Sequence, residues 1–158
     1  MTLHVGDVAP KFSLRAIDGQ TYSLNHELTL AIFFKTSCPT CQLAWRYYER
    51  LHRAYQANGL HLWGISQHNR EKTQKYAAKY GATFPHLIDD NLKVSREYDP
   101  EFVPTGFLID ADGKIVETFT SWNRARLNQL SEQIASRLNV SPQEMIQPEE
   151  NVVAFKPG

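Results

Sequence analysis

An almost entirely apolar run, LTLAIFF at residues 28–34, is followed three residues later by Cys38-Pro39-Thr40-Cys41, which holds the only two cysteines of the chain. Such a run predicts a central strand that is covered on both faces of a sheet. Beyond the cysteines, apolar residues recur at helical spacing as far as Tyr55, and Gly59 is placed to end that helix. The cysteine pair is therefore expected at the point where a buried strand passes into a helix.

Three roles are open to such a pair: a redox centre, half of a metal site, or a disulfide that braces the fold. A chain of 158 residues can fold around its own apolar core, and a disulfide across so short a loop removes little entropy from the unfolded chain. A tetrahedral zinc site needs four ligands, but the chain has no second cysteine pair and no two histidines at the usual spacing. These considerations favour redox chemistry, and no metal is expected.

Two Asp-Gly dipeptides, at residues 18–19 and 112–113, each separate two short segments of strand character. Asp-Gly between such segments is a strong signal for a β-hairpin. The four hairpin strands are expected over residues 11–16, 20–24, 105–110 and 114–119.

Between the two hairpins, residues 60–66 have the pattern of a second buried strand, residues 70–80 that of a helix that stops at Gly81, and residues 84–88 that of a short strand. With the strand and helix around the cysteines, this order predicts an α/β fold whose mixed sheet has helices on both faces. No internal repeat is present.

A last helix is expected to begin after Asn123, which suits the N-cap position, and to run to about Leu138. Trp122 and Leu127 flank this start at the spacing of a hydrophobic staple. Residues 141–158 lose periodicity and gain proline and acid, so they are expected to form a tail that lies on the surface or is partly disordered. The chain is thus divided into a domain at 1–140 and a tail at 141–158.

The chemistry of the cysteine pair follows from its place at a helix start. If Cys38 is the N-cap, Pro39 takes the first helical position, where its missing N–H costs nothing. The N–H groups of Thr40 and Cys41 then point toward the Cys38 sulfur, which should lower the pKa of Cys38 and make it the attacking thiolate. Cys41, one turn further in, would be shielded and would resolve the mixed disulfide. Lys35 either adds a cation nearby or is an exposed residue at the strand end.

Three sequence blocks carry a family resemblance: GDVAPKFSLRAIDGQTYSL near the N-terminus, FFKTSCPTC, and VPTGFLIDADGKIV. In this order and spacing the chain resembles the TlpA and ResA branch of the thioredoxin superfamily, which borders the peroxiredoxins, over about residues 5–138. The resemblance implies a thioredoxin-like fold with an N-terminal hairpin extension. It also implies a thiol-disulfide oxidoreductase with no cofactor beyond a redox-active disulfide between Cys38 and Cys41.

The same resemblance implies where a client protein would bind. In the family, the proline of the VPT segment is cis and faces the disulfide, and the residue before it offers its backbone to an extended client chain; Pro104 and Val103 match these positions. Substrate contacts are also expected from Pro39, Thr40 and Phe102.

The sequence departs from the thioredoxin pattern at three positions around the cysteines. Ser37 stands where a tryptophan is usual, and Ile32 stands where a buried acid normally accepts the proton of the second cysteine. Arg46 replaces a proline that kinks the helix, so the helix is expected to run straighter.

The proton acceptor for Cys41 is therefore open. ResA-like proteins use a glutamate after the next strand, but here that loop has no acid before Glu71. Water and, less favourably, His68 are the alternatives, and the interpretation of His68 as an ordinary solvent-exposed loop histidine is preferred. Lys35, Thr36 and His68 are the residues expected around the cysteine pair.

Two other functions remain as alternatives. A peroxiredoxin-like thiol peroxidase needs a PxxxTxxC pattern, but Lys35 holds the threonine position, Thr36 is one residue late and Leu30 replaces the proline. A non-catalytic thioredoxin-like binding module would keep the fold and leave the cysteines unused. A peroxide assay and the redox behaviour of the pair distinguish these functions.

Charge and composition restrict the partners. Lys+Arg and Asp+Glu both number 17, so no net charge attracts nucleic acid or an anionic membrane. No long apolar segment and no signal peptide is seen, so a cytoplasmic protein is expected as the sequence is written, or a periplasmic or membrane-tethered one if it is trimmed. The protein is also expected to be a monomer. The expected partners are client proteins with disulfides or dithiols and an unidentified reductase or oxidant that recycles the pair.

Overall fold

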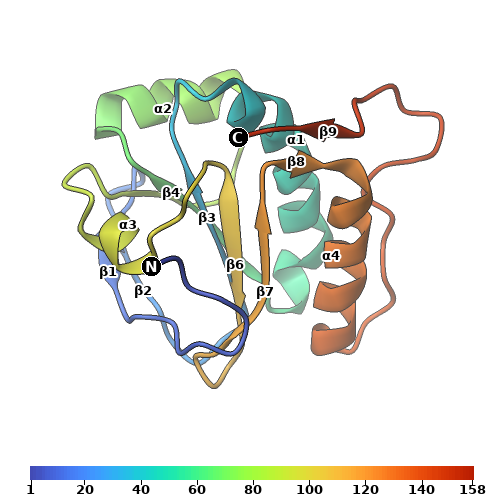
Figure 1. The fold of residues 1–158 in the computed structure, drawn as a ribbon, viewed down its shortest axis with the longest axis horizontal. Coiled ribbons are helices and arrows are strands. Elements are labelled where there is room, and N and C mark those ends of the chain that lie inside the picture. Colours follow the sequence, from blue (N-terminus) through green and yellow to red (C-terminus); the bar gives the residue numbers. More distant parts are fainter.

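The chain folds around one five-stranded mixed sheet in a computed structural model that describes residues 1–158 (Figure 1). The strand order is β5-β4-β3-β6-β7, in which β3, β4 and β5 are parallel and β6 and β7 are antiparallel to their neighbours. The strands are β3 (Thr29–Phe34), β4 (His61–Ser66), β5 (His86–Ile88), β6 (Thr105–Ile109) and β7 (Ile115–Thr120). This arrangement confirms the predicted α/β class and places the first cysteine directly after the central strand.

Helices lie on both faces of the sheet because alternate residues of the fully buried strand β3 point to opposite cores. One core receives side chains from α1, α2 and α4, and the other from α3 and the N-terminal segment. The helices are α1 (Pro39–Tyr55), which continues into a short 3-10 turn (Gln56–Asn58), α2 (Arg70–Lys79), α3 (Lys93–Tyr98) and α4 (Arg124–Leu138). The helix α3 is not predicted from the sequence. None of the helices is both long and apolar enough to cross a membrane.

The structure also contains the predicted end of the first helix and the predicted N-terminal hairpin. Gly59 follows the 3-10 turn with a positive φ of 111°, a conformation that favours glycine. The helix α1 is continuous through Arg46, as expected from the absence of the kink proline. The predicted N-terminal hairpin is formed by β1 (Ser13–Arg15) and β2 (Thr21–Ser23), which pair antiparallel beside the second core.

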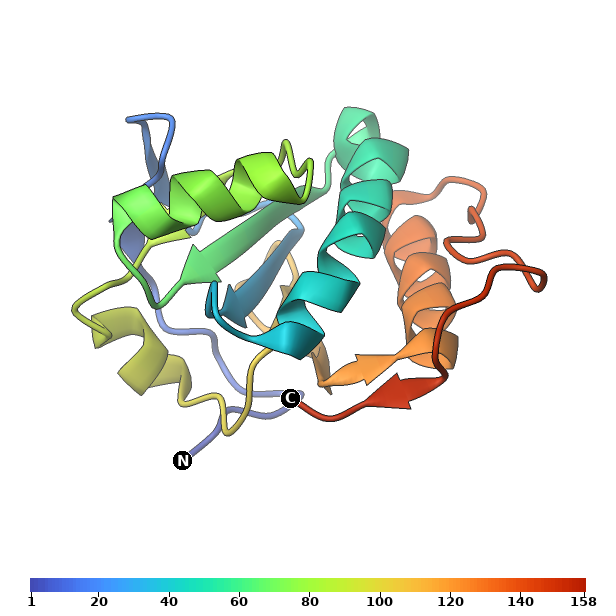
Figure 2. The same ribbon diagram turned by 90° about the horizontal axis from the view of Figure 1, so that it is seen from above.

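The tail, residues 141–158, is more closely joined to the fold than its sequence suggests. Much of it lies along the surface, but Met145 and Ile146 are buried in the first core, against α1 and α4. Further on, β9 (Phe155–Lys156) pairs antiparallel with β8 (Trp122–Asn123), so the tail returns to the domain. Figure 2 shows that this return brings the C-terminus close to the beginning of α1.

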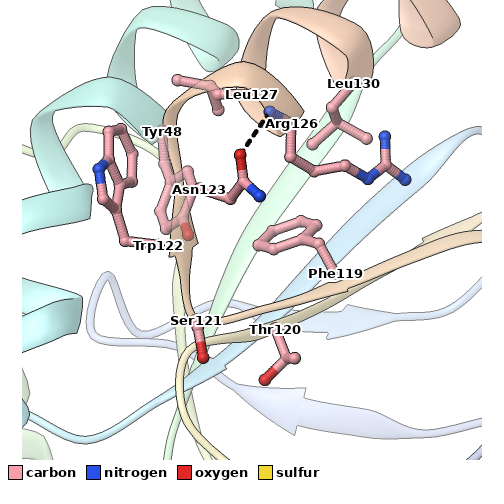
Figure 3. Close-up of a pocket in the computed structure, with 9 residues that line it drawn as sticks. All are labelled: Tyr48, Phe119, Thr120, Ser121, Trp122, Asn123, Arg126, Leu127 and Leu130. Carbon is pink, nitrogen blue, oxygen red and sulfur yellow. Dashed lines mark hydrogen bonds between the residues drawn. The ribbon is translucent and has the colours of Figure 1, made fainter. Parts of the chain in front are cut away.

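The start of α4 is fixed by Asn123 as predicted. Its side-chain oxygen accepts a hydrogen bond from the backbone N–H of Arg126 at 3.0 Å, the contact drawn in Figure 3. Trp122 and Leu127 on either side are both buried in the first core, as the staple spacing predicts. The turn from β7 into α4 is thereby held in one conformation, and this turn also carries Ser121.

Replacing Asn123 by alanine should lower the free energy of unfolding by about 1 kcal/mol, because the Arg126 N–H loses its acceptor. Urea denaturation followed by circular dichroism would measure this loss. The control is Gln129→Ala on the same helix, where an exposed side chain without a hydrogen-bond partner is replaced. An equal loss in both variants would contradict the capping role.

Candidate functional site

Cys38 is the N-cap of α1, as the sequence predicts. Its backbone is extended, Pro39 occupies the first helical position, and the Cys38 sulfur accepts a hydrogen bond from the backbone N–H of Cys41 at 3.0 Å. The buried strand β3 delivers the chain to this point, and a backbone hydrogen bond from Cys38 N–H to the Lys35 carbonyl closes the connecting turn. The unpaired N–H groups and the positive dipole end of the helix therefore face one sulfur.

The two cysteines differ in exposure. Both are free thiols, but Cys41 is fully buried in the first core whereas Cys38 is only partly buried. A client disulfide can therefore approach Cys38 and not Cys41. No group of three or more histidine, cysteine or acidic side chains is placed to bind a metal ion.

Hydrogen bonding and burial move the pKa values of the two thiols in opposite directions. The pKa of Cys38 is lowered to about 6, mainly because the Cys41 thiol donates to its sulfur, and also because the backbone N–H groups of Cys41 and Thr40 point at it. Burial raises the pKa of Cys41, and the adjacent Cys38 sulfur raises it further. Cys38 is thus a thiolate near neutral pH while Cys41 keeps its proton.

The Val103-Pro104 segment lies opposite Cys38, where the family resemblance places it. The peptide bond between the two residues is cis, and the Cys38 sulfur lies 3.4 Å from the Val103 carbonyl oxygen, to which it donates when protonated. Pro104 is buried and its carbonyl accepts the Ser121 N–H at 2.9 Å. Phe102 remains 48% exposed beside it. The expected client-contact residues are therefore gathered around one sulfur.

The three residues expected around the cysteine pair, Lys35, Thr36 and His68, lie in different surroundings. The hydroxyl of Thr36 lies 2.6 Å from Nδ1 of His68, and the Thr36 N–H also donates to this nitrogen at 3.3 Å. His68 is therefore a partly buried partner of the cysteine loop, and its ring makes no hydrogen bond to either sulfur. Lys35 is exposed, and the cation that lowers the pKa of Cys38 is Lys156.

The position of the missing acid is filled by an apolar side chain. Ile32 is fully buried in the first core, together with Tyr48 and Tyr76. Burial raises the pKa values of both tyrosines, and the charges of Cys41 and Cys38 raise them further. The Tyr76 hydroxyl is buried without a hydrogen-bond partner. The surroundings of Cys41 thus disfavour charge. Trp45 and Tyr47 are buried in the same core, and Trp63 is buried in the second core.

Residues of the tail form part of the site, which was not predicted. The Thr40 hydroxyl donates to the Pro157 carbonyl at 2.5 Å across 117 positions of sequence. Gly158 approaches Val103, and Lys156 lies near enough to Cys38 to lower its pKa. No sequence signal marks these contacts, because β9 has only two residues and neither periodicity nor a motif.

Comparison with known protein families assigns the chain to one of them. The sequence model of the AhpC/TSA family matches residues 5–118, which include both cysteines and the Val103-Pro104 segment. The chain belongs to the AhpC/TSA family. Within this family it is similar to thiol-disulfide oxidoreductase ResA of Geobacillus thermodenitrificans, with 30% identity over 120 residues that cover 73% of this chain and 69% of the relative. It is also 29% identical to ResA of Halalkalibacterium halodurans over 119 residues.

Solved structures agree with the thioredoxin-like fold. A Chlorobium tepidum protein provisionally assigned as thiol:disulfide interchange protein DsbE superposes with a TM-score of 0.80 and 25% identity, covering 87% of this chain and 99% of its own. A thiol:disulfide interchange protein from Bacteroides sp. has a TM-score of 0.74 at 24% identity, which shows the fold alone. The chain is a thioredoxin-like oxidoreductase of the ResA type, as the sequence blocks indicate.

The thiolate of Cys38 should control alkylation by iodoacetamide. With a pKa of about 6, the reactive fraction should rise from about a tenth at pH 5 to about nine tenths at pH 7, because only the thiolate attacks. Rates measured by mass spectrometry across this range would locate the midpoint. Cys41→Ala should move the midpoint upward, since the Cys41 thiol is the main group that lowers this pKa. An unchanged midpoint would contradict that cause.

Proposed function

We propose that this AhpC/TSA-family chain exchanges two electrons with disulfides or dithiols of client proteins through Cys38 and Cys41. The observation that carries the proposal is the asymmetry of the pair. One sulfur is accessible, lies at a helix N-terminus and has a lowered pKa, whereas the other is buried with a raised pKa. An attacking thiolate and a protected resolving thiol require this difference.

In the reducing direction, the Cys38 thiolate attacks one sulfur of a client disulfide. The Cys38–client bond forms as the client S–S bond breaks, and the second client sulfur leaves as a thiolate. Cys41 then loses its proton and attacks Cys38, which forms the Cys38–Cys41 disulfide and releases the first client sulfur. Two electrons pass to the client. A separate redox partner restores the dithiol, and the reverse sequence oxidises a client dithiol.

The proton of Cys41 is assigned to water in this cycle. No carboxylate is among the groups that shift the pKa of Cys41, and Ile32 occupies the place of an acid. His68 is engaged with Thr36. The two sulfurs carry the electrons, so no other cofactor takes part.

The client chain is proposed to run past Val103 and Pro104, with Pro39 and Thr40 beneath it and Phe102 at its side. This placement is supported by the 3.4 Å contact between the Cys38 sulfur and the Val103 carbonyl, because a group bound at that carbonyl is next to the attacking atom. The exposed ring of Phe102 offers apolar surface to the client.

Trapping tests the roles of the two cysteines. Cys41→Ser should accumulate disulfide-linked client through Cys38, since the mixed disulfide forms and cannot be resolved. Cys38→Ser should trap little. Incubation with insulin at pH 8, followed by non-reducing electrophoresis, would measure both. Equal trapping by the two variants, or by neither, would overturn the assignment.

The redox potential of the pair should lie between about −270 mV and about −120 mV, because a better stabilised thiolate favours the reduced form. A Cys38 pKa near 6 is below that of thioredoxin at about 7 and above that of DsbA at about 3.5. Equilibration with glutathione buffers would give the value. A potential near the lower limit indicates a reductant of clients, and one near the upper limit an oxidant.

Thiol peroxidase activity is expected to be low. A hydroxyl directed at the peroxide would have to come from position 35, which is lysine, and the Thr36 hydroxyl is engaged with His68. Peroxide consumption at a rate comparable with client exchange would favour the peroxidase alternative over the proposed exchange.

A further inference from the structure

Residues 155–158 cross the site beside the helix start that carries Cys38. In Figure 2 the strand β9 lies next to β8, and the chain then turns toward the beginning of α1. Pairing of Trp122 with Lys156 and of Asn123 with Phe155 sets this course. A segment of the tail thus forms a separate two-stranded sheet with β8 before the chain reaches the active site.

The segment contacts the groups that a client would be expected to use. The Pro157 carbonyl accepts the Thr40 hydroxyl, and Thr40 is only 2% exposed although it lies between the two cysteines. At Gly158 the approach is so close that a β-carbon would lie 2.4 Å from the Val103 carbonyl oxygen. The Cys38 thiol contacts this same oxygen. The tail backbone therefore occupies the space beside both the attacking sulfur and the Val103 backbone.

Ser121 joins the tail to the Val103-Pro104 segment. Its N–H donates to the Pro104 carbonyl, and its hydroxyl accepts the Gly158 N–H at 2.9 Å. Figure 3 shows the Ser121 hydroxyl pointing away from α4. The tail is thereby hydrogen-bonded to both sides of the site, at Thr40 and at Ser121.

The anchorage of the tail is uneven along its length. Upstream, Met145 and Ile146 are buried, and the guanidinium group of Arg124 donates to four backbone carbonyls of the tail. By contrast, the Phe155 ring is 58% exposed and lines an open groove together with Phe102. No residue of 155–158 is buried, so their release breaks the pairing with β8 and the hydrogen bonds at Thr40 and Ser121 while the remainder of the tail stays in place.

We propose that residues 155–158 form an internal strap that occupies the client-binding site and must be displaced by an extended segment of the client. The strap has the extended backbone expected of such a client segment, because it pairs with β8 as a strand and brings its backbone to Val103. The apparent affinity for clients is then the intrinsic affinity multiplied by the fraction of molecules in which the strap leaves the site free. The inference rests on the proposed function only in calling the displaced ligand a client.

Gly158→Val tests the strap because any side chain at this position collides with the Val103 carbonyl. The matched control is Asn151→Val, which adds the same side chain at an exposed tail position without a hydrogen-bond partner. Ser121→Ala is a second variant, which removes the acceptor of the Gly158 N–H without adding bulk. Thermal melting of all three checks that the domain remains folded.

The first readout is alkylation of Cys38 at pH 8.5, where Cys38 is a thiolate in every variant. A maleimide attached to a polyethylene glycol chain should react faster with Gly158→Val and Ser121→Ala than with the unaltered protein, whereas iodoacetamide should react at similar rates. A strap that is closed about 90% of the time lowers access about tenfold, so an increase of up to about tenfold is expected. Equal rates for the bulky reagent in all proteins would overturn the strap.

The second readout is disulfide exchange, with insulin as the protein client and oxidised glutathione as the small one. Gly158→Val should speed exchange with insulin more than with glutathione, and Asn151→Val should change neither. If exchange proceeds but Gly158→Val has no effect in either readout, the strap is wrong and the proposed function stands. If only alkylation responds and no protein shows exchange, the strap is supported and the proposed function is wrong.

Discussion

The site depends on the helix start at Cys38, where the backbone N–H of Cys41 donates a hydrogen bond to the Cys38 sulfur. This bond can form because the fully buried strand β3 fixes where α1 begins, and because Pro39 at the first helical position leaves the next donors free to turn toward the N-cap. Both the low pKa of Cys38 and the burial of Cys41 follow from this helix start. The sheet therefore acts as the support that holds one sulfur at the end of a helix.

The difference between the pKa values of Cys38 and Cys41 arises without a buried carboxylate. Ile32 fills the place of that acid, and Tyr48 and Tyr76 pack in the same core. The hydrogen bond between the two cysteine side chains, burial and backbone donors thus separate the two pKa values, while the nearby cation comes from Lys156 in the tail. A site built in this way favours the Cys38 thiolate strongly and gives Cys41 no side chain that would take its proton.

Most of the architecture could be predicted because local signals agree with the fold. Asp-Gly turns mark both hairpins, and Asn123 caps α4. The helix α3 lacks such a signal: it begins after Leu92, and its first N–H groups are satisfied by the Asp89 carboxylate, which accepts from Val94 and Ser95. That acceptor lies outside the usual N-cap position, so residues 93–98 could not be recognised as a helix from their spacing.

The sequence by itself determined the redox pair, the helix on which it stands and the Val103-Pro104 segment, because each depends on residues that are close together or on a motif of fixed spacing. Only the tertiary structure decided what lies next to them. The contact of Thr40 with Pro157 and that of Val103 with Gly158 join positions far apart in the chain. They arise because the burial of Met145 and Ile146, together with the pairing of β9 with β8, directs an otherwise unpatterned tail back toward the site. Burial of two side chains and pairing with β8, and not a motif, therefore bring the tail to the active site.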